Sequence, residues 1–151
     1  MRHSEILLNI RALLRLYSKN GETIRNSHQL TEAELDVLAF LGNNPNLNTA
    51  RDVTEYRLLP KANVSLAVDA LIKKGYLSGR QDDHDRRRVR LCLTPRGEAV
   101  IPEIREDRKR FEEILFSGFT PEERNEYQNM NARIANNAHA YLEEERYDER
   151  N

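Results

Sequence analysis

The stretch that decides the fold runs from Asp82 to Gly97 and has the sequence DDHDRRRVRLCLTPRG. It begins with acids and arginines, continues as alternating polar and apolar residues, and ends in a Thr-Pro pair typical of a helix start. Alternation in a strand places every second side chain on one face, here Val89, Leu91 and Leu93. We therefore predict a β-hairpin with strands at 76–80 and 88–94 and an arginine-rich tip, followed directly by a helix.

The residues before the hairpin predict a helix-turn-helix. A helix over 60–74 has one apolar side and ends at Gly75, a residue typical of the position after a helix. A shorter helix precedes it and is capped by Asn48 or Thr49. The first turn and the exposed side of the longer helix carry Lys61, Ala62, Asn63, Ser65 and Leu66. Together with the hairpin, this order of elements predicts a winged helix-turn-helix.

Helices flank the winged helix on both sides. Residues 4–25 carry two apolar stripes, which indicates two packing partners, although a wholly buried single helix would give the same pattern. After the wing, one helix opens at Pro95, with a kink or break expected at Pro102, and another opens at Pro121. Surplus apolar faces at both ends of a chain favour a two-fold dimer. We thus expect a mainly α protein with a small β-hairpin wing, comprising an N-terminal dimerisation helix (1–29), a winged helix-turn-helix DNA-binding domain (30–97) and C-terminal dimerisation helices (98–151).

Charge is unevenly distributed along the 151 residues, although the net charge is only −1. Residues 51–96 hold 11 Lys or Arg against 6 Asp or Glu, whereas the rest of the chain holds 13 against 19. The predicted helix-turn-helix and wing are therefore basic, and their flanks are acidic. A basic surface of this kind attracts a polyanion such as double-stranded DNA.

Other classes of protein find little support in the sequence. It contains no apolar run of the ~20 residues that a membrane span needs and no signal peptide, so we expect a soluble cytoplasmic protein. Cys92 is the single cysteine, which excludes an intramolecular disulfide, and we expect it to be a small packing residue. No Gly-rich phosphate loop, His-Glu-x-x-His motif or set of nucleophile and base is present, so we expect neither enzymatic activity nor a cofactor nor a metal site.

Four short motifs are specific enough to indicate a family. They are LIKKGYL at 71–77, Arg80, DRR at 85–87 and LTPRG at 93–97. In order and spacing they resemble the multiple-antibiotic-resistance regulator (MarR) family of winged-helix transcription factors, and the resemblance covers nearly the whole chain. It implies a homodimeric repressor whose two winged helices bind the halves of a palindromic operator. It also implies control by a small lipophilic or phenolic ligand, lodged between the dimerisation helices and the winged helix.

The resemblance also assigns roles to individual residues. Asn63 and Ser65 match recognition-helix positions that face the major groove of DNA. Arg86 matches the wing arginine that enters the minor groove, which favours narrow, A·T-rich DNA. Asp85 and Arg87 match the ionic supports of the wing.

Further DNA contacts are expected from residue chemistry. Lys61, Arg87 and Arg88 are placed to bind phosphates, which supply most of the affinity of such proteins and its salt dependence. Leu66 departs from the family, which often has a polar or basic residue at this position. Contact with a thymine methyl is an alternative to a hydrogen bond there, so Leu66 stays among the DNA-binding candidates.

Alternative interpretations remain open at this stage. The charged residues of 82–88 also suit a solvated turn with weak surface ion pairs. A metal site of Asp82, Asp83, His84 and Asp85 is disfavoured, because adjacent residues on a turn do not readily converge on one ion. Exposed Leu66 and the acidic flanks also suit a winged helix that binds protein instead of DNA. Pocket candidates that core packing or the dimer interface explain equally well are Arg15, Tyr17, His28 and Phe40.

Overall fold

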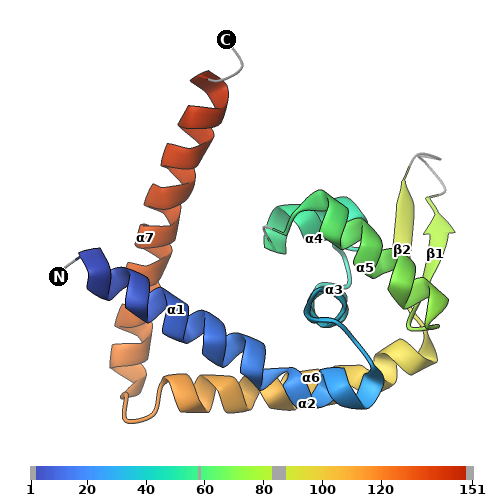
Figure 1. Ribbon diagram of the computed structural model, residues 1–151, viewed down its shortest axis with the longest axis horizontal. Helices are drawn as coiled ribbons and strands as arrows, with labels where there is room; N and C mark the ends of the chain where they lie inside the picture. The colour runs from blue at the N-terminus through green and yellow to red at the C-terminus, as the bar shows by residue number, and fades with distance from the viewer. Residues whose placement is uncertain (1–2, 58, 83–87, 149–151) are drawn as a thin grey trace. The chain divides into compact units, whose positions relative to one another are not determined.

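The computed structural model describes residues 3–57, 59–82 and 88–148 (Figure 1). Its elements are, in chain order, α1 (His3–Asn20), α2 (Glu22–His28), α3 (Glu32–Asn43), α4 (Ala50–Arg57), α5 (Lys61–Lys73), β1 (Leu77–Gln81), β2 (Val89–Leu93), α6 (Pro95–Leu115) and α7 (Pro121–Asp148). The chain divides into two compact units, Met1–Phe111 and Glu112–Asn151. The predicted class, mainly α with a hairpin wing, is confirmed. In the described segments no helix is long and apolar enough to cross a bilayer.

The first unit contains the winged helix. α5 packs against α3, α4 and β1, and β1 pairs with β2 in an antiparallel hairpin whose register joins Leu77 to Leu93 (Figure 1). β2 is also tied to the loop before α4, because the backbone nitrogen of Leu91 donates to the carbonyl oxygen of Asn48 at 2.7 Å. The most deeply buried side chains of this core are Val37, Leu38, Val53, Val64, Leu71, Tyr76 and Val100.

Side-chain caps fix the starts of the helices in the winged helix. Thr31 and Glu34 form the capping box that their Thr-x-x-Glu spacing indicates. Thr49, one of the two predicted caps of α4, does the same with Asp52: the Thr49 nitrogen donates to Asp52 Oδ2 at 2.9 Å, and the Asp52 nitrogen donates to Thr49 Oγ1 at 3.1 Å. Pro60 precedes α5 and does not open it, one residue away from the predicted position.

The predicted helix over 4–25 is in fact two helices. α1 ends at Asn20 and α2 begins at Glu22. Gly21 between them is buried, and a Cβ atom built on it would lie 2.6 Å from Leu35 Cδ2. Glycine has low helix propensity and no side chain, so it both weakens a continuous helix and allows the turn to pack against α3.

α6 begins at its predicted cap and presses against the winged helix. The Gly97 nitrogen donates to Thr94 Oγ1 at 3.1 Å, and a Cβ atom at Gly97 would lie only 2.2 Å from the carbonyl oxygen of Tyr76. α6 then continues through Pro102 without the break that was one expected outcome. Pro102 lies on an exposed side of the helix, where water can replace the hydrogen bond that Glu98 loses.

The second unit consists of the end of α6, a turn and α7. Thr120 and Glu123 form a capping box at the start of α7, with N···O distances of 2.8 and 3.2 Å. The Phe116 ring packs edge-on against Phe119 and Tyr127, with centroid distances of 5.8 and 5.4 Å. Large apolar side chains farther along α7 remain exposed: Met130, Ile134, Tyr141 and Leu142.

We predict that Gly97→Ala lowers the free energy of unfolding by about 1–3 kcal/mol, the usual cost of overpacking a close contact. Alanine ordinarily stabilises a helix relative to glycine, so a loss of stability would report the contact with Tyr76. Chemical denaturation measures the effect, with exposed Glu98→Ala as the control, which should stay within about 0.5 kcal/mol of the parent. A Gly97→Ala protein as stable as the parent would contradict the close approach.

Candidate nucleic-acid interface

α5 presents two chemically different sides. The buried side contributes Val64, Ala67, Val68 and Leu71 to the core. The other side exposes Lys61, Asn63 and Ser65, as predicted, and also Leu66, for which exposure was one of the alternatives. The first turn of α5 holds no acidic residue, so the partial positive charge of the helix N-terminus adds to the charge of Lys61. The exposed first half of α5 can therefore approach a polyanion.

Two side chains lie elsewhere than the sequence suggested. Ile72 belongs to the apolar side of the predicted helix, yet it is 40% exposed, because it lies about 100° around the helix from buried Leu71. Cys92 is exposed and is not a packing residue, because successive side chains of β2 alternate between faces and Leu91 takes the buried one.

The predicted wing contacts fall partly outside the described residues. Asp85, Arg86 and Arg87 all lie outside them. Arg88 is described and exposed, and its carbonyl oxygen accepts a hydrogen bond from the Asp82 nitrogen at 3.0 Å. The exposed side chain of Arg88 thus lies at the base of the hairpin tip.

An ion pair that the sequence alone did not reveal braces the base of the wing. The side chain of Asp82 is buried, and its Oδ2 atom accepts a hydrogen bond from Arg90 Nε at 2.5 Å. The register places Arg80 opposite Arg90, so Asp82 lies diagonally across the hairpin from Arg90, a spacing at which opposite charges can meet. Asp82 and Arg90 are eight residues apart in the sequence, and this spacing alone does not predict an ion pair. The pair becomes predictable only when the register of the hairpin is known.

A second ion pair fixes the C-terminal end of α5. Lys74 Nζ lies 2.7 Å from Glu34 Oε2 and donates to the Gln29 carbonyl oxygen at 2.7 Å. Glu34 is buried and also accepts a hydrogen bond from the Thr31 nitrogen at 2.8 Å. One carboxylate therefore serves both the cap of α3 and the end of α5, which holds α5 in a fixed orientation on α3.

Tyr76 joins the winged helix to α2 and α6. The guanidinium of Arg96 lies over the Tyr76 ring, 4.4 Å from its centroid, and Nη1 donates to the Lys74 carbonyl oxygen at 2.8 Å. His28 lies 3.4 Å from the Tyr76 hydroxyl and 3.0 Å from a Glu103 carboxylate oxygen. Because of these contacts, a displacement of α2 or α6 would shift Tyr76 and, through it, the C-terminal end of α5.

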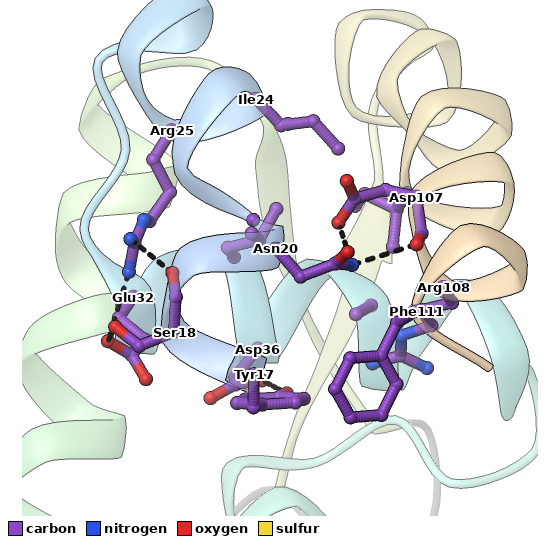
Figure 2. Close-up of a pocket in the computed structure, with 14 residues that line it drawn as sticks. Tyr17, Ser18, Asn20, Ile24, Arg25, Glu32, Asp36, Asp107, Arg108 and Phe111 are labelled. Carbon is purple, nitrogen blue, oxygen red and sulfur yellow. Dashed lines mark hydrogen bonds and ion pairs between the residues drawn. The ribbon is translucent and has the colours of Figure 1, made fainter. Parts of the chain in front are cut away.

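A small cavity lies between α1, α2, α3 and α6 (Figure 2). Its volume is about 40 Å³, enough to hold water but well below the ~300 Å³ of the smallest typical ligand pockets. Figure 2 shows the Tyr17 hydroxyl bonded to Asp36, and Asn20 Nδ2 bonded to Asp107 Oδ2 at 2.6 Å. Of the four pocket candidates, Tyr17 lines this cavity, whereas Arg15, His28 and Phe40 do not.

The cavity wall carries groups with perturbed ionisation. Burial, followed by the hydrogen bond to Asp36, raises the pKa of Tyr17 to about 12. Burial also lowers the pKa of Arg108, with a further contribution from the nearby charge of Arg57. Burial raises the pKa of Asp107. A half-buried cation and a partly exposed phenol beside apolar side chains are groups that a small polar ligand could contact.

A helix-turn-helix with a basic exposed helix and a hairpin wing defines the chain as a winged-helix protein. A family model described as "MarR family" matches residues 28–88. The HTH-type transcriptional repressor MdtR of Bacillus subtilis is 27% identical over 132 residues, which are 87% of this chain and 84% of MdtR. A MarR protein from Peptoclostridium difficile superposes with a TM-score of 0.80 at 26% identity, over 91% of this chain and 90% of its own.

A further similar structure is that of BpsR from Bordetella bronchiseptica, whose regulation of DNA binding by 6-hydroxynicotinic acid has been described. It is 25% identical, with a TM-score of 0.71 over 89% of this chain and 93% of that chain. The family model ends at residue 88, just before β2, and these relatives extend the likeness over nearly the whole length. Residues 28–88 thus match the MarR family model, and nearly the whole chain is similar to transcriptional regulators of that family.

We predict that Asp36→Asn lowers the pKa of Tyr17 from about 12 towards its ordinary value of 10.0. The raised pKa means that the neutral phenol contributes to stability fully below pH 10 and that this contribution is lost as the pH rises through about 12. The difference in phenolate absorbance between each protein and its Tyr17→Phe variant measures the pKa. Asp107→Asn, in the same cavity but not bonded to Tyr17, should leave it unchanged. Titration of Tyr17 near 10 in the parent would contradict the desolvation of the phenol and its hydrogen bond to Asp36.

Proposed function

We propose that the protein is a homodimeric, sequence-specific DNA-binding repressor of the cytoplasm, without enzymatic activity or a cofactor. The observation that carries this proposal is the exposed first half of α5, which is polar and basic and is held on α3 by the Lys74–Glu34 pair. A helix that only faces solvent has no functional need for the ion pair to buried Glu34 that fixes its orientation. A helix that enters a groove of DNA does need a fixed orientation.

Both ends of the chain offer apolar surface for a second copy. On α1 the exposed large apolar residues are Ile6, Leu7, Leu8, Ile10, Leu13, Leu14 and Tyr17. On α7 they include Met130 and Ile134. Exposed apolar surface on two helices is what an obligate homodimer interface covers. We therefore assign 1–29 and 98–151 to dimerisation and 30–97 to DNA binding.

The proposed contacts separate affinity from sequence preference. Lys61, Arg87 and Arg88 bind phosphates, and Asn63 and Ser65 contact bases in the major groove. Arg86 enters a narrow, A·T-rich minor groove, with Asp85 and Arg87 as its supports. The Asp82–Arg90 pair at the base of the hairpin would limit movement of the wing during this contact.

We also propose that a small lipophilic or phenolic acid releases the protein from DNA. BpsR, whose DNA binding is regulated by 6-hydroxynicotinic acid, is the relative that motivates this step. The cavity must open to admit such a molecule, with Arg108 beside its carboxylate and Phe111 beside its ring. Entry would separate Tyr17 from Asp36, and Asp36 belongs to α3, the helix that orients α5.

The second candidate is a winged helix that binds protein. The exposure of Leu66, at 70%, favours it, because an apolar side chain in solvent is a potential protein contact. Phosphate contacts respond steeply to salt and an apolar protein contact hardly does, which separates the two functions experimentally.

Selection of bound duplexes from a random pool by the full-length protein tests the proposed function. We expect enrichment of an inverted repeat whose half-site centres lie about 10–10.5 base pairs, or a multiple of that, apart. Asn63→Ala should lose about 10-fold or more in discrimination at one position of each half-site, because a base contact disappears. Asn26→Ala, an exposed asparagine on α2, is the matched control and should select the same sequence as the parent.

Failure to enrich any sequence would contradict a specific regulator. Enrichment of a single half-site without an inverted repeat would support DNA binding but would contradict binding as a homodimer.

A further inference from the structure

Leu66 occupies an unusual place on α5. Its side chain is 70% exposed, whereas the apolar residues of the buried stripe, Val64, Ala67, Val68 and Leu71, are at most 7% exposed. Ile72 is the other exposed large apolar residue of α5. It follows Leu66 by six positions and therefore lies about 240° from Leu66 around the helix axis, on a different side of α5. Leu66 is thus an isolated leucine on the side of α5 that carries the proposed DNA contacts.

The surface around Leu66 is polar or made of small side chains. Asn63 precedes it by one turn, and Asp69 follows by one turn, so these two exposed residues are its neighbours on the helix. A shallow groove between α3 and α5 adjoins Leu66 and is lined mainly by small residues, which include Thr31, Ala33 and Ala70. This surface lacks the contiguous apolar area that a protein interface requires. It can accommodate a single apolar group.

Base pairs differ in what they offer such a side chain. In the major groove guanine, cytosine and adenine present hydrogen-bond donors and acceptors, whereas thymine also presents its C5-methyl group. Leucine can neither donate nor accept, so opposite the other bases it would remove water from polar edges without replacing their hydrogen bonds. Asn63, one turn away, has the side chain that pairs with adenine through two hydrogen bonds. Both residues therefore favour A·T pairs.

We infer that Leu66 is a specificity-determining residue that selects a thymine in each half-site through its C5-methyl group. This inference rests on the proposed function, because it requires α5 to enter the major groove. It goes further in assigning a base and an atom to one side chain.

Deoxyuridine tests the contact, since it differs from thymidine only by lacking the C5-methyl group. Each thymine of the operator selected by the parent protein is replaced singly by deoxyuridine, and the affinity is measured at fixed salt. At one thymine per half-site we expect the parent to lose about four-fold in affinity, the value of one buried methyl group. Leu66→Ala should bind the thymine and deoxyuridine duplexes equally at that position.

Ile72→Ala is the matched control, because it truncates an exposed apolar residue of the same helix on a different side. It should retain the four-fold preference for thymine. Circular dichroism and the affinity for an unrelated duplex verify that Leu66→Ala is folded and keeps its phosphate contacts.

Three results would overturn the inference. In the first, the protein binds a specific sequence, but at no thymine does the effect of removing the methyl group differ between the parent and Leu66→Ala. This result leaves the proposed function intact and excludes thymine selection by Leu66. Equal weakening of both duplexes by Leu66→Ala gives Leu66 a role other than reading the methyl group. Absence of sequence-specific DNA binding removes the proposed function and the inference together.

Discussion

The burial of one apolar stripe of α5 against α3 is the constraint on which the interface depends. Val64 and Leu71 are exposed by 1% or less, so α5 cannot rotate about its axis without bringing these side chains into water. Each buried side chain of this size is worth about 1.5–3 kcal/mol. Because Asn63 and Leu66 lie on the remaining surface of the same helix, the core determines what the interface presents. The Lys74–Glu34 pair adds a polar contact at the end of α5 that disfavours sliding along α3.

A second constraint connects this helix to the rest of the first unit. The carbonyl oxygen of Tyr76 leaves no room for a side chain at Gly97, and the ring of Tyr76 lies under Arg96. The start of α6 therefore packs directly against Tyr76, which follows the end of α5. α6 also forms a wall of the cavity at Tyr17. In the ligand control proposed above, a molecule that opened the cavity would act on α5 from two directions, through Asp36 on α3 and through Tyr76.

Most of the winged helix could be predicted from the sequence because its signals are local. Thr31 and Glu34, Thr94 and Gly97, and the apolar stripe of α5 each depend on spacings of three or four residues. Contacts between distant segments could not be predicted in this way. Asp82 meets Arg90 only through the hairpin register, Lys74 meets Glu34 across 40 residues, and the turn at Gly21 depends on Leu35. The spacing of the apolar residues within 4–25 gave no indication of that turn. Of the candidate site, the α5 residues lie exposed as expected, whereas the roles of Arg86 and Arg87 remain predictions from the resemblance.

The central claim is that basic side chains of the winged helix bind DNA phosphates. Its most direct test is the salt dependence of the affinity for a selected duplex, measured by fluorescence anisotropy from low to physiological ionic strength. Lys61, Arg87 and Arg88 from both copies would neutralise about six phosphates, so the logarithm of the association constant should fall against the logarithm of the salt concentration with a slope of about −5. An affinity that does not change over this range would contradict the claim.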